Sequence, residues 1–116
     1  MSEHDEQAAI FQWASLSMVT YPELAYLFAI PNGTYTTLSV GKKMKAEGVK
    51  KGVPDLSLPV PRGKYHGFYL ELKHGRNQPS EEQKQWIDAL CSLGYYAVVA
   101  WGWEEAIEQI KKYLDQ

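Results

Sequence analysis

Residues 52–73 read GVPDLSLPVPRGKYHGFYLELK and contain two segments that predict neighbouring β-strands. In residues 55–60, and again in residues 66–73, apolar and polar side chains alternate with the period of two that a strand requires. The link between them is a short Pro-Arg-Gly-Lys segment, so we expect the two strands to pair as an antiparallel hairpin. Pro59 and Pro61 restrict the first strand to a sheet edge or make it end early.

Three chemically active side chains converge in this predicted hairpin. Asp55 opens the first strand, whereas Glu71 and Lys73 lie on one face of the second. Because the start of one strand lies beside the end of its antiparallel partner, we expect Asp55 to lie close to Glu71 and Lys73. Two neighbouring carboxylates repel each other and stay ionised at low cost only when a cation lies between them. Their oxygen atoms, without a His or Cys cluster, favour Mg²⁺ or Mn²⁺ over zinc.

Such a metal site predicts phosphodiester hydrolysis. The metal lowers the pKa of a bound water and neutralises charge on a phosphoryl oxygen. Lys73 is placed to orient the attacking water or to stabilise the negative charge on the phosphate. The alternatives are structural, because Asp is common at turns and because Glu71 with Lys73 also fits an exposed charge pair on a sheet.

Residues 3–19 predict an amphipathic helix that precedes the hairpin. Its apolar residues recur at intervals of three and four, which places them on one face: Ile10, Phe11, Trp13, Ala14 and Met18. Glu6 lies on this inward face, one turn before Ile10, and a buried acid needs a partner. We therefore expect Glu6 to complete the metal site, although an acid in the first turn of a helix is favourable in any case.

The remaining segments predict a central sheet with helices around it. They comprise a strand over 26–33 that stops at a Pro-Asn-Gly turn, a short helix over 36–48, a helix over 80–94, an apolar strand over 95–101 of the kind buried on both faces, and a helix over 104–114. The helix over 80–94 begins with a capping-box pattern, and its predicted buried stripe is Trp86, Ile87, Leu90 and Cys91. We expect a single α/β domain over residues 1–116, with a central mixed β-sheet flanked by helices.

Positive charge is concentrated around the hairpin. The chain has a net charge of -2, but residues 42–76 carry nine Lys and Arg against three acids, a local net charge of +6. Clustered basic residues neutralise phosphates whatever the overall charge, so this segment predicts a nucleic-acid partner; a solvated lysine face explains the charge equally well. The candidate phosphate contacts are Lys42, Lys43, Lys45, Lys50, Lys51, Arg76 and Asn77.

The N-terminal residues and the cysteine content predict a cytoplasmic protein. The segment MSEHDEQ is acidic and leads into no continuous apolar stretch, so neither a signal peptide nor a membrane span is indicated. A single cysteine, Cys91, excludes an internal disulfide and a zinc site built from cysteines, which suits a reducing compartment. Its place in an apolar helix pattern predicts that Cys91 is buried.

Four segments resemble the VRR-NUC (virus-type replication-repair nuclease) branch of the PD-(D/E)XK nuclease superfamily: EQAAIFQW at 6–13, KAEGVKKGVPDL at 45–56, GFYLELK at 67–73 and SEEQKQWIDALCSLGY at 80–95. The resemblance implies a PD-(D/E)XK nuclease-like core whose metal ligands are Asp55, Glu71, the Leu72 carbonyl and Glu6. It further implies that Lys73 is the catalytic lysine and that Gln83 lies near the active site. Closing the capping box with Ser80 would also explain Gln83.

Similar stand-alone phage and bacterial proteins cut branched DNA such as Holliday junctions and act as homodimers. The resemblance therefore implies a Mg²⁺- or Mn²⁺-dependent, structure-selective DNA endonuclease that acts as a homodimer and takes no small-molecule substrate. Two other hypotheses stay open. One is a nucleic-acid-binding module that keeps the nuclease-like fold without cleaving, and the other is a protein-interaction domain whose lysines only aid solubility.

Overall fold

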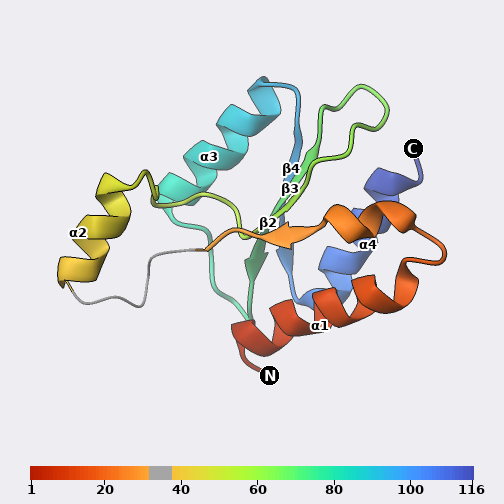
Figure 1. Ribbon diagram of the computed structural model, residues 1–116, viewed down its shortest axis with the longest axis horizontal. Helices are drawn as coiled ribbons and strands as arrows, with labels where there is room; N and C mark the ends of the chain where they lie inside the picture. The colour runs from red at the N-terminus through yellow and green to blue at the C-terminus, as the bar shows by residue number, and fades with distance from the viewer. Residues whose placement is uncertain (32–37) are drawn as a thin grey trace.

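The computed structural model describes residues 1–31 and 38–116. Its elements, in chain order, are α1 (Glu3–Ser17), the 3-10 helix η1 (Pro22–Tyr26), β1 (Phe28–Ala29), α2 (Leu38–Ala46), β2 (Leu56–Leu58), β3 (Phe68–Lys73), α3 (Glu81–Ser92), β4 (Tyr96–Trp101) and α4 (Trp103–Leu114) (Figure 1). The predicted order of helices and strands is confirmed, with η1 as an addition. The turn residues Asn32 and Gly33 and the predicted helix start at residues 36 and 37 lie outside the described residues. None of the described helices is long and apolar enough to cross a membrane.

The strands form one mixed sheet in the order β1-β2-β3-β4. β2 pairs antiparallel with both β1 and β3, and β3 pairs parallel with β4. The predicted hairpin is therefore confirmed, with Leu56 opposite Leu70 and Leu58 opposite Phe68. β2 ends at Leu58, as the following Pro59 requires, but it is an interior strand because β1 covers its other side.

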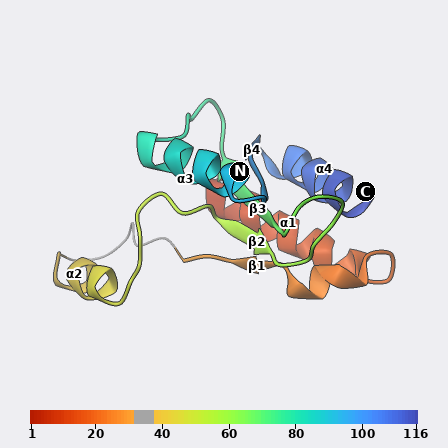
Figure 2. The ribbon, with the colours of Figure 1, turned by 90° about the horizontal axis from the view of Figure 1, so that it is seen from above.

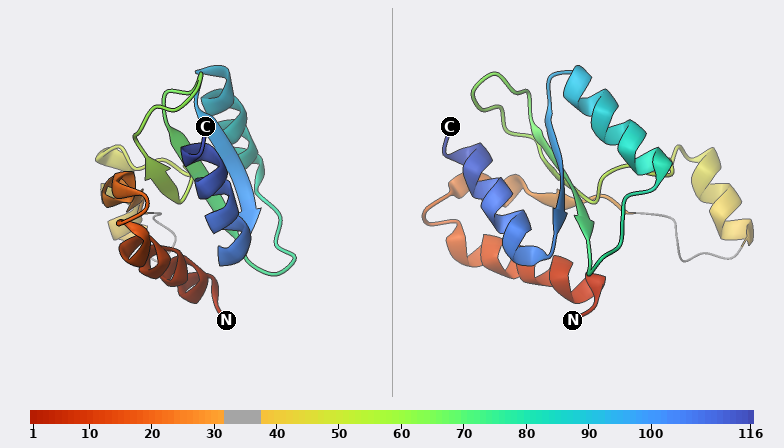
Figure 3. Two further views of the ribbon diagram at one scale, coloured as in Figure 1. Left: turned by 90° about the vertical axis from the view of Figure 1, so that its right-hand side faces the viewer. Right: turned by 180° about the vertical axis from the view of Figure 1, so that it is seen from behind.

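Helices cover both faces of the sheet. α1 and α4 pack against each other and against β3 on one face, whereas α3 packs against β4 on the other (Figure 2). The first face holds the main core, in which Phe68, Leu70 and Leu72 of β3 pack with Ile10 of α1 and Ile110 of α4. α2 lies to the side of the sheet, beyond α3 (Figure 3). This layering leaves the ends of β3 and β4, the first turn of α1 and the start of α3 around one region of the molecule.

Local chemistry determines where the helices near this region begin and end. At α1, Asp5 N donates to the Ser2 hydroxyl at 3.1 Å and Ser2 N donates to the Asp5 carboxylate at 3.0 Å, which closes a capping box. The predicted box at α3 is confirmed in the same way by Ser80 and Gln83. α1 ends at Ser17, before the predicted residue 19, so Met18 is exposed rather than part of the buried stripe.

One prediction about burial around β4 is wrong and the other is largely confirmed. Cys91 is exposed, and Leu90 is the buried member of the stripe predicted in α3. β4 is an edge strand, but helices cover both of its faces, because α3 packs on one and α4 on the other. Ala97 and Ala100 are buried there, and only Trp101, at the end of β4, is exposed.

Candidate active site

Asp55 is held where β1, β2 and β3 meet. It directly precedes β2, and its backbone carbonyl accepts a hydrogen bond from Ile30 N at 2.7 Å. Its side-chain Oδ2 accepts a buried hydrogen bond from Leu72 N at 2.7 Å. The first bond ties Asp55 to the chain after β1, and the second ties it to β3. The carboxylate is therefore oriented toward the end of β3 rather than toward solvent, which excludes a simple turn role.

Glu71 lies beside Asp55 and is almost completely buried, with 1% of its surface exposed. Burial, the negative charge of Asp55 and a side-chain hydrogen bond with Asp55 together raise the pKa of Glu71 to about 9, against the opposing effect of Lys73. Among the residues that the structure describes, Glu71 Oε1 has no hydrogen-bond partner. A buried carboxylate oxygen without a partner is costly, so this position favours a bound cation.

Lys73 lies on the same face of β3 as Glu71, because the two residues are two apart on a strand. Its Nζ lies 3.7 Å from Glu71 Oε2, and the side chain of Lys73 is only 12% exposed. Its backbone carbonyl accepts a hydrogen bond from Gly102 N at 3.0 Å. The structure thus brings Asp55, Glu71 and Lys73 together as predicted, and their burial excludes an exposed surface charge pair.

The three side chains line a cleft of about 1170 Å³. α1 contributes Glu3, His4 and Gln7 to its lining, and the start of α3 contributes Ser80 and Gln83. Figure 1 shows the first turn of α1 beside the chain that leaves β3, which explains how the two ends of the sequence share this cleft. Lysines from α2 and the following loop complete the lining: Lys45, Lys50 and Lys51. The cleft therefore combines a buried pair of acids with exposed positive charge.

Glu6, the predicted third acid of the metal site, does not line the cleft in this structure, so its role as a ligand stays a prediction. Glu6 is buried, as its place on the apolar stripe indicated, but that stripe faces α4. Its Oε2 accepts a hydrogen bond from Trp103 N at 3.0 Å, so Glu6 caps the start of α4. The acid of α1 that does line the cleft is Glu3, one turn before Glu6, and Gln7 lines it as well. Glu3 and Gln7 are four residues apart, and this spacing is the sequence signal that would have indicated a second polar face on α1.

Three of the seven predicted phosphate contacts line the cleft: Lys45, Lys50 and Lys51. Lys51 also forms an exposed ion pair with Glu82 at 3.7 Å. The described positions of the other four lie outside the lining of the cleft: Lys42, Lys43, Arg76 and Asn77. Asn77 has a structural contact instead, since its backbone carbonyl accepts a hydrogen bond from Trp101 Nε1 at 2.8 Å. Charge density along the sequence therefore overestimated how many of these residues reach the cleft.

Gln83 and Leu72 occupy the positions expected of them, and their chemical roles stay predictions. Gln83 lines the cleft, while its Oε1 accepts a hydrogen bond from Ser80 N at 2.8 Å. It therefore both closes the capping box and borders the candidate site. Leu72 is buried between Glu71 and Lys73, with its N–H bound to Asp55. Its carbonyl belongs to the same short segment as the two acids.

The donor set fits a divalent cation that prefers oxygen. Two carboxylates lie in contact, and one of them has a buried oxygen without a partner among the described residues. Within residues 1–31 and 38–116, no group of three His, Cys, Asp or Glu side chains forms a metal cluster. The remaining ligands would therefore be backbone carbonyls, water or substrate, which is how Mg²⁺ is usually bound in proteins.

Comparison with known proteins identifies the family. The VRR-NUC domain matches residues 2–103 of the chain. A solved structure named "VRR_NUC domain protein" superposes with a TM-score of 0.84 at 31% sequence identity, covering 99% of this chain and 89% of that chain. A comparison with curated proteins finds no match. The mixed sheet between helices is consistent with the PD-(D/E)XK fold of this family, so the resemblance inferred from the sequence is confirmed. This chain belongs to the VRR-NUC domain family of nucleases.

Proposed function

We propose that residues 1–116 form a single nuclease domain that hydrolyses phosphodiester bonds in DNA as a divalent-metal-dependent endonuclease. The observation that supports this function is the buried contact of Asp55 with Glu71, with Lys73 Nζ 3.7 Å from Glu71, in a cleft lined by lysines. Two carboxylates held together in a buried place oppose folding, and the ammonium of Lys73 only partly offsets this, because the pKa of Glu71 is still raised to about 9. Strongly perturbed acids in a cleft are typical of catalytic sites.

Asp55 and Glu71 are the proposed ligands of Mg²⁺ or Mn²⁺, and the Leu72 carbonyl is the proposed third oxygen. When bound, the metal supplies stabilisation of phosphate charge and a water of lowered pKa. Glu71 Oε1 supports this assignment, because it is a buried acceptor that no described residue satisfies.

Lys73 is proposed to act on the reacting phosphate group. Its ammonium is largely buried beside Glu71, where it can donate hydrogen bonds to the attacking water or to the phosphate oxygen that gains negative charge. The exposed lysines of the cleft are proposed to bind neighbouring phosphates without regard to base sequence: Lys45, Lys50 and Lys51. Binding of the DNA backbone and hydrolysis of one of its bonds are thus assigned to different side chains.

The preference for branched DNA and the homodimer are proposals that rest on the sequence resemblance. A domain of 116 residues offers little surface with which to hold both arms of a four-way junction. A pair of chains would double that surface and would present two cleavage sites to two strands. The same pairing is the proposed basis for selecting branched DNA over a linear duplex.

A cleavage panel tests the proposed function. The substrates are a four-way junction, a flap, a nicked duplex and a linear duplex, each with Mg²⁺, with Mn²⁺ and with a chelator, and the mass of the protein is measured in solution. We expect cleavage of branched DNA that stops in the chelator. Lys73→Met is expected to lower the rate by at least about 100-fold. The matched control is Lys84→Met, because Lys84 is an exposed lysine of α3 that pairs with Glu81 at 3.5 Å.

The panel also separates the alternative function. Cleavage that persists in the chelator, or in Lys73→Met at the wild-type rate, contradicts the proposal. Salt-sensitive binding to the junction without product at any Mg²⁺ or Mn²⁺ concentration supports the non-catalytic binding module instead.

A further inference from the structure

A second, smaller groove opens beside the cleft, between α1 and β1. Its volume is about 420 Å³, and its lining includes His4, Gln7, Ala8 and Phe11 of α1 and Phe28 and Ala29 of β1. The α1 residues recur at intervals of three and four, so they form one face of the helix. Leu27, which is buried, also borders the groove.

The groove adjoins the cleft. His4, Gln7 and Ala29 line both cavities, so the two are direct neighbours. A ligand bound in the cleft therefore lies next to the groove. The occupant of the groove is then the part of the substrate that adjoins the group held at Asp55 and Glu71.

The two cavities differ in chemistry. The cleft contains four lysines, including Lys73, whereas the described residues that line the groove include no lysine or arginine. The groove instead offers apolar surface and the hydrogen-bonding side chains of His4 and Gln7 at its boundary. Phosphates are favoured in the cleft, and a flat, largely uncharged group with polar edges is favoured in the groove.

Phe28 is the side chain in the groove that is available for stacking. It is 48% exposed, although it is a large apolar residue on a strand. Both residues of β1 are exposed, and the register partner of Phe28 is Ser57 of β2. Exposed aromatic side chains beside a positively charged groove are the usual platform on which proteins stack unpaired bases.

We infer that this groove binds one unpaired nucleobase of the substrate strand, next to the phosphate in the cleft, with Phe28 as the stacking side chain. The inference rests on the proposed function and makes it narrower. A base in a duplex is already stacked on both sides, so only a base at a branch point, in a single-stranded arm or flipped out of the helix can enter. The groove thereby gives this domain a means of selecting DNA with an unpaired nucleotide at the cut site.

Binding measured in a chelator tests the inference without requiring cleavage. The DNA is a duplex with a single-stranded arm, in which an abasic site replaces each nucleotide in turn around the branch point. At one position, loss of the base should weaken wild-type binding by about 5- to 150-fold. Phe28→Ala should weaken binding of the intact DNA by a similar factor, and the two changes together should cost no more than either alone.

Three controls make the result specific. Tyr26→Ala removes an exposed aromatic side chain that precedes β1 and lies outside the described lining of both cavities, so it should leave binding unchanged. Phe28→Leu keeps apolar bulk without an aromatic face and should lose most of the effect. Binding of a fully paired duplex should be the same for wild type and Phe28→Ala. The thermal midpoint of each variant verifies that it is folded.

The outcomes separate this inference from the proposed function. Additive losses from Phe28→Ala and the abasic site, or equal losses on paired and unpaired DNA, overturn it. A change of solution mass in Phe28→Ala together with a general loss of binding also overturns it, because the groove then belongs to a contact between two chains. If the effects of Phe28→Ala and the abasic site are coupled but no DNA is cleaved, the groove keeps its proposed role and the nuclease proposal is contradicted. If DNA is cleaved but the two effects are not coupled, the nuclease proposal stands and the role of the groove is contradicted.

Discussion

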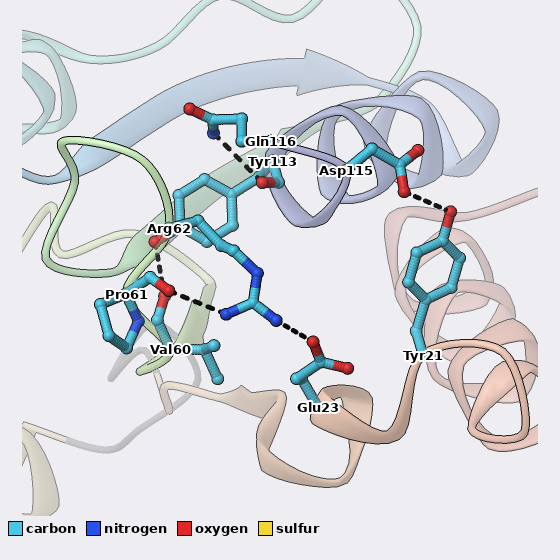
Figure 4. Close-up of polar contacts among 8 residues, drawn as sticks. All are labelled: Tyr21, Glu23, Val60, Pro61, Arg62, Tyr113, Asp115 and Gln116. Carbon is cyan, nitrogen blue, oxygen red and sulfur yellow. Dashed lines mark hydrogen bonds and ion pairs between the residues drawn. The ribbon is translucent and has the colours of Figure 1, made fainter.

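The two ends of the sheet differ in how their polar groups are paired. At the end formed by the β2–β3 loop, η1 and the end of α4, opposite charges pair and hydrogen-bond donors meet acceptors (Figure 4). Arg62 pairs with Glu23 of η1 and donates to the Pro61 carbonyl at 2.9 Å. The Tyr113 hydroxyl of α4 donates to the Val60 carbonyl. These contacts join distant segments and leave each of these groups satisfied.

At the cleft end, two carboxyl groups meet instead, with Lys73 Nζ 3.7 Å from Glu71. Asp55 and Glu71 are both acids, and Glu71 Oε1 is buried without a partner among the described residues. The loop end therefore contributes to the stability of the fold, whereas we expect the buried acids of the cleft end to lower stability until a cation binds. Substitutions at the two ends should therefore differ in the sign of their effect on stability.

Glu71→Gln should produce the largest change and should move activity and stability in opposite directions. Cleavage should fall by at least about 100-fold, because a proposed metal ligand is lost. Between the ordinary pKa of 4.5 and the folded value of about 9, the folded state holds more protons on Glu71 than the unfolded state. The free energy of unfolding of the metal-free protein therefore falls as pH rises through this window.

The variant lacks this carboxyl group, so it should be more stable than the wild type by about 1–3 kcal/mol at pH 8 and should differ little at pH 4. Urea unfolding in a chelator at several pH values measures the difference. An equal pH dependence in both proteins would contradict the like-charge description of the cleft.

Mg²⁺ should offset the loss of stability that we expect from the buried acids of the cleft end. A metal that binds the folded state at 100 times its dissociation constant stabilises a protein by about 2.7 kcal/mol. We expect the thermal midpoint of the wild type to rise with Mg²⁺ and to return to its starting value with a chelator. Asp55→Asn should show no such rise, and NaCl at matched ionic strength is the control. A rise of the same size in Asp55→Asn would place the metal elsewhere.

Substitutions of Glu6 distinguish a role in capping α4 from a role in binding metal. Glu6→Ala removes the acceptor for Trp103 N and should lower stability by about 0.5–2 kcal/mol, whereas Glu6→Gln keeps an acceptor and should lose less. Because Glu6 caps α4 in this structure, both variants should keep the stabilisation by Mg²⁺. Thermal unfolding with and without Mg²⁺ measures both quantities. Loss of the stabilisation by Mg²⁺ in Glu6→Gln would instead support Glu6 as a metal ligand.

Tyr113→Phe should produce the smallest change, confined to the loop end. It removes the hydroxyl that donates to the Val60 carbonyl and should cost about 0.5–1.5 kcal/mol. The rate of cleavage should stay at the wild-type value, because Tyr113 lies at the opposite end of the sheet from Asp55. Parallel measurements of unfolding and cleavage test this, and a large loss of activity would show that the two ends are coupled.

The hairpin and the contact of its three candidate catalytic side chains were predictable because their signals are local. Period-two alternation and a short link determine that Asp55 meets Glu71 and Lys73, whatever the rest of the chain does. Residues that depend on distant packing were not predictable in this way. Glu3 and Glu6 both lie in the first turns of α1, and only the position of α4 determines which of them is buried against it and which lines the cleft.

The edge position of β4 shows the same limit. Its sequence is as apolar as that of an interior strand, and α3 and α4 cover its faces, but among the described residues only β3 pairs with it. The exposure of Cys91 was not predictable either, because it depends on how α3 lies against the sheet. η1 was not predicted either, since its five residues are too few for a periodic pattern.

The short length of β2 determines how the Asp55 side chain is held. Pairing with β3 stops at Leu56, and the next N–H of β3 that needs an acceptor, that of Leu72, takes a side-chain oxygen of Asp55 where a longer strand would have offered main chain. The proposed ligand Asp55 is thus held in place by folding itself. Because its rotational entropy is already lost, we expect it to bind an ion at a lower cost than a freely rotating acid would. The short strand would then supply one preorganised half of the proposed metal site.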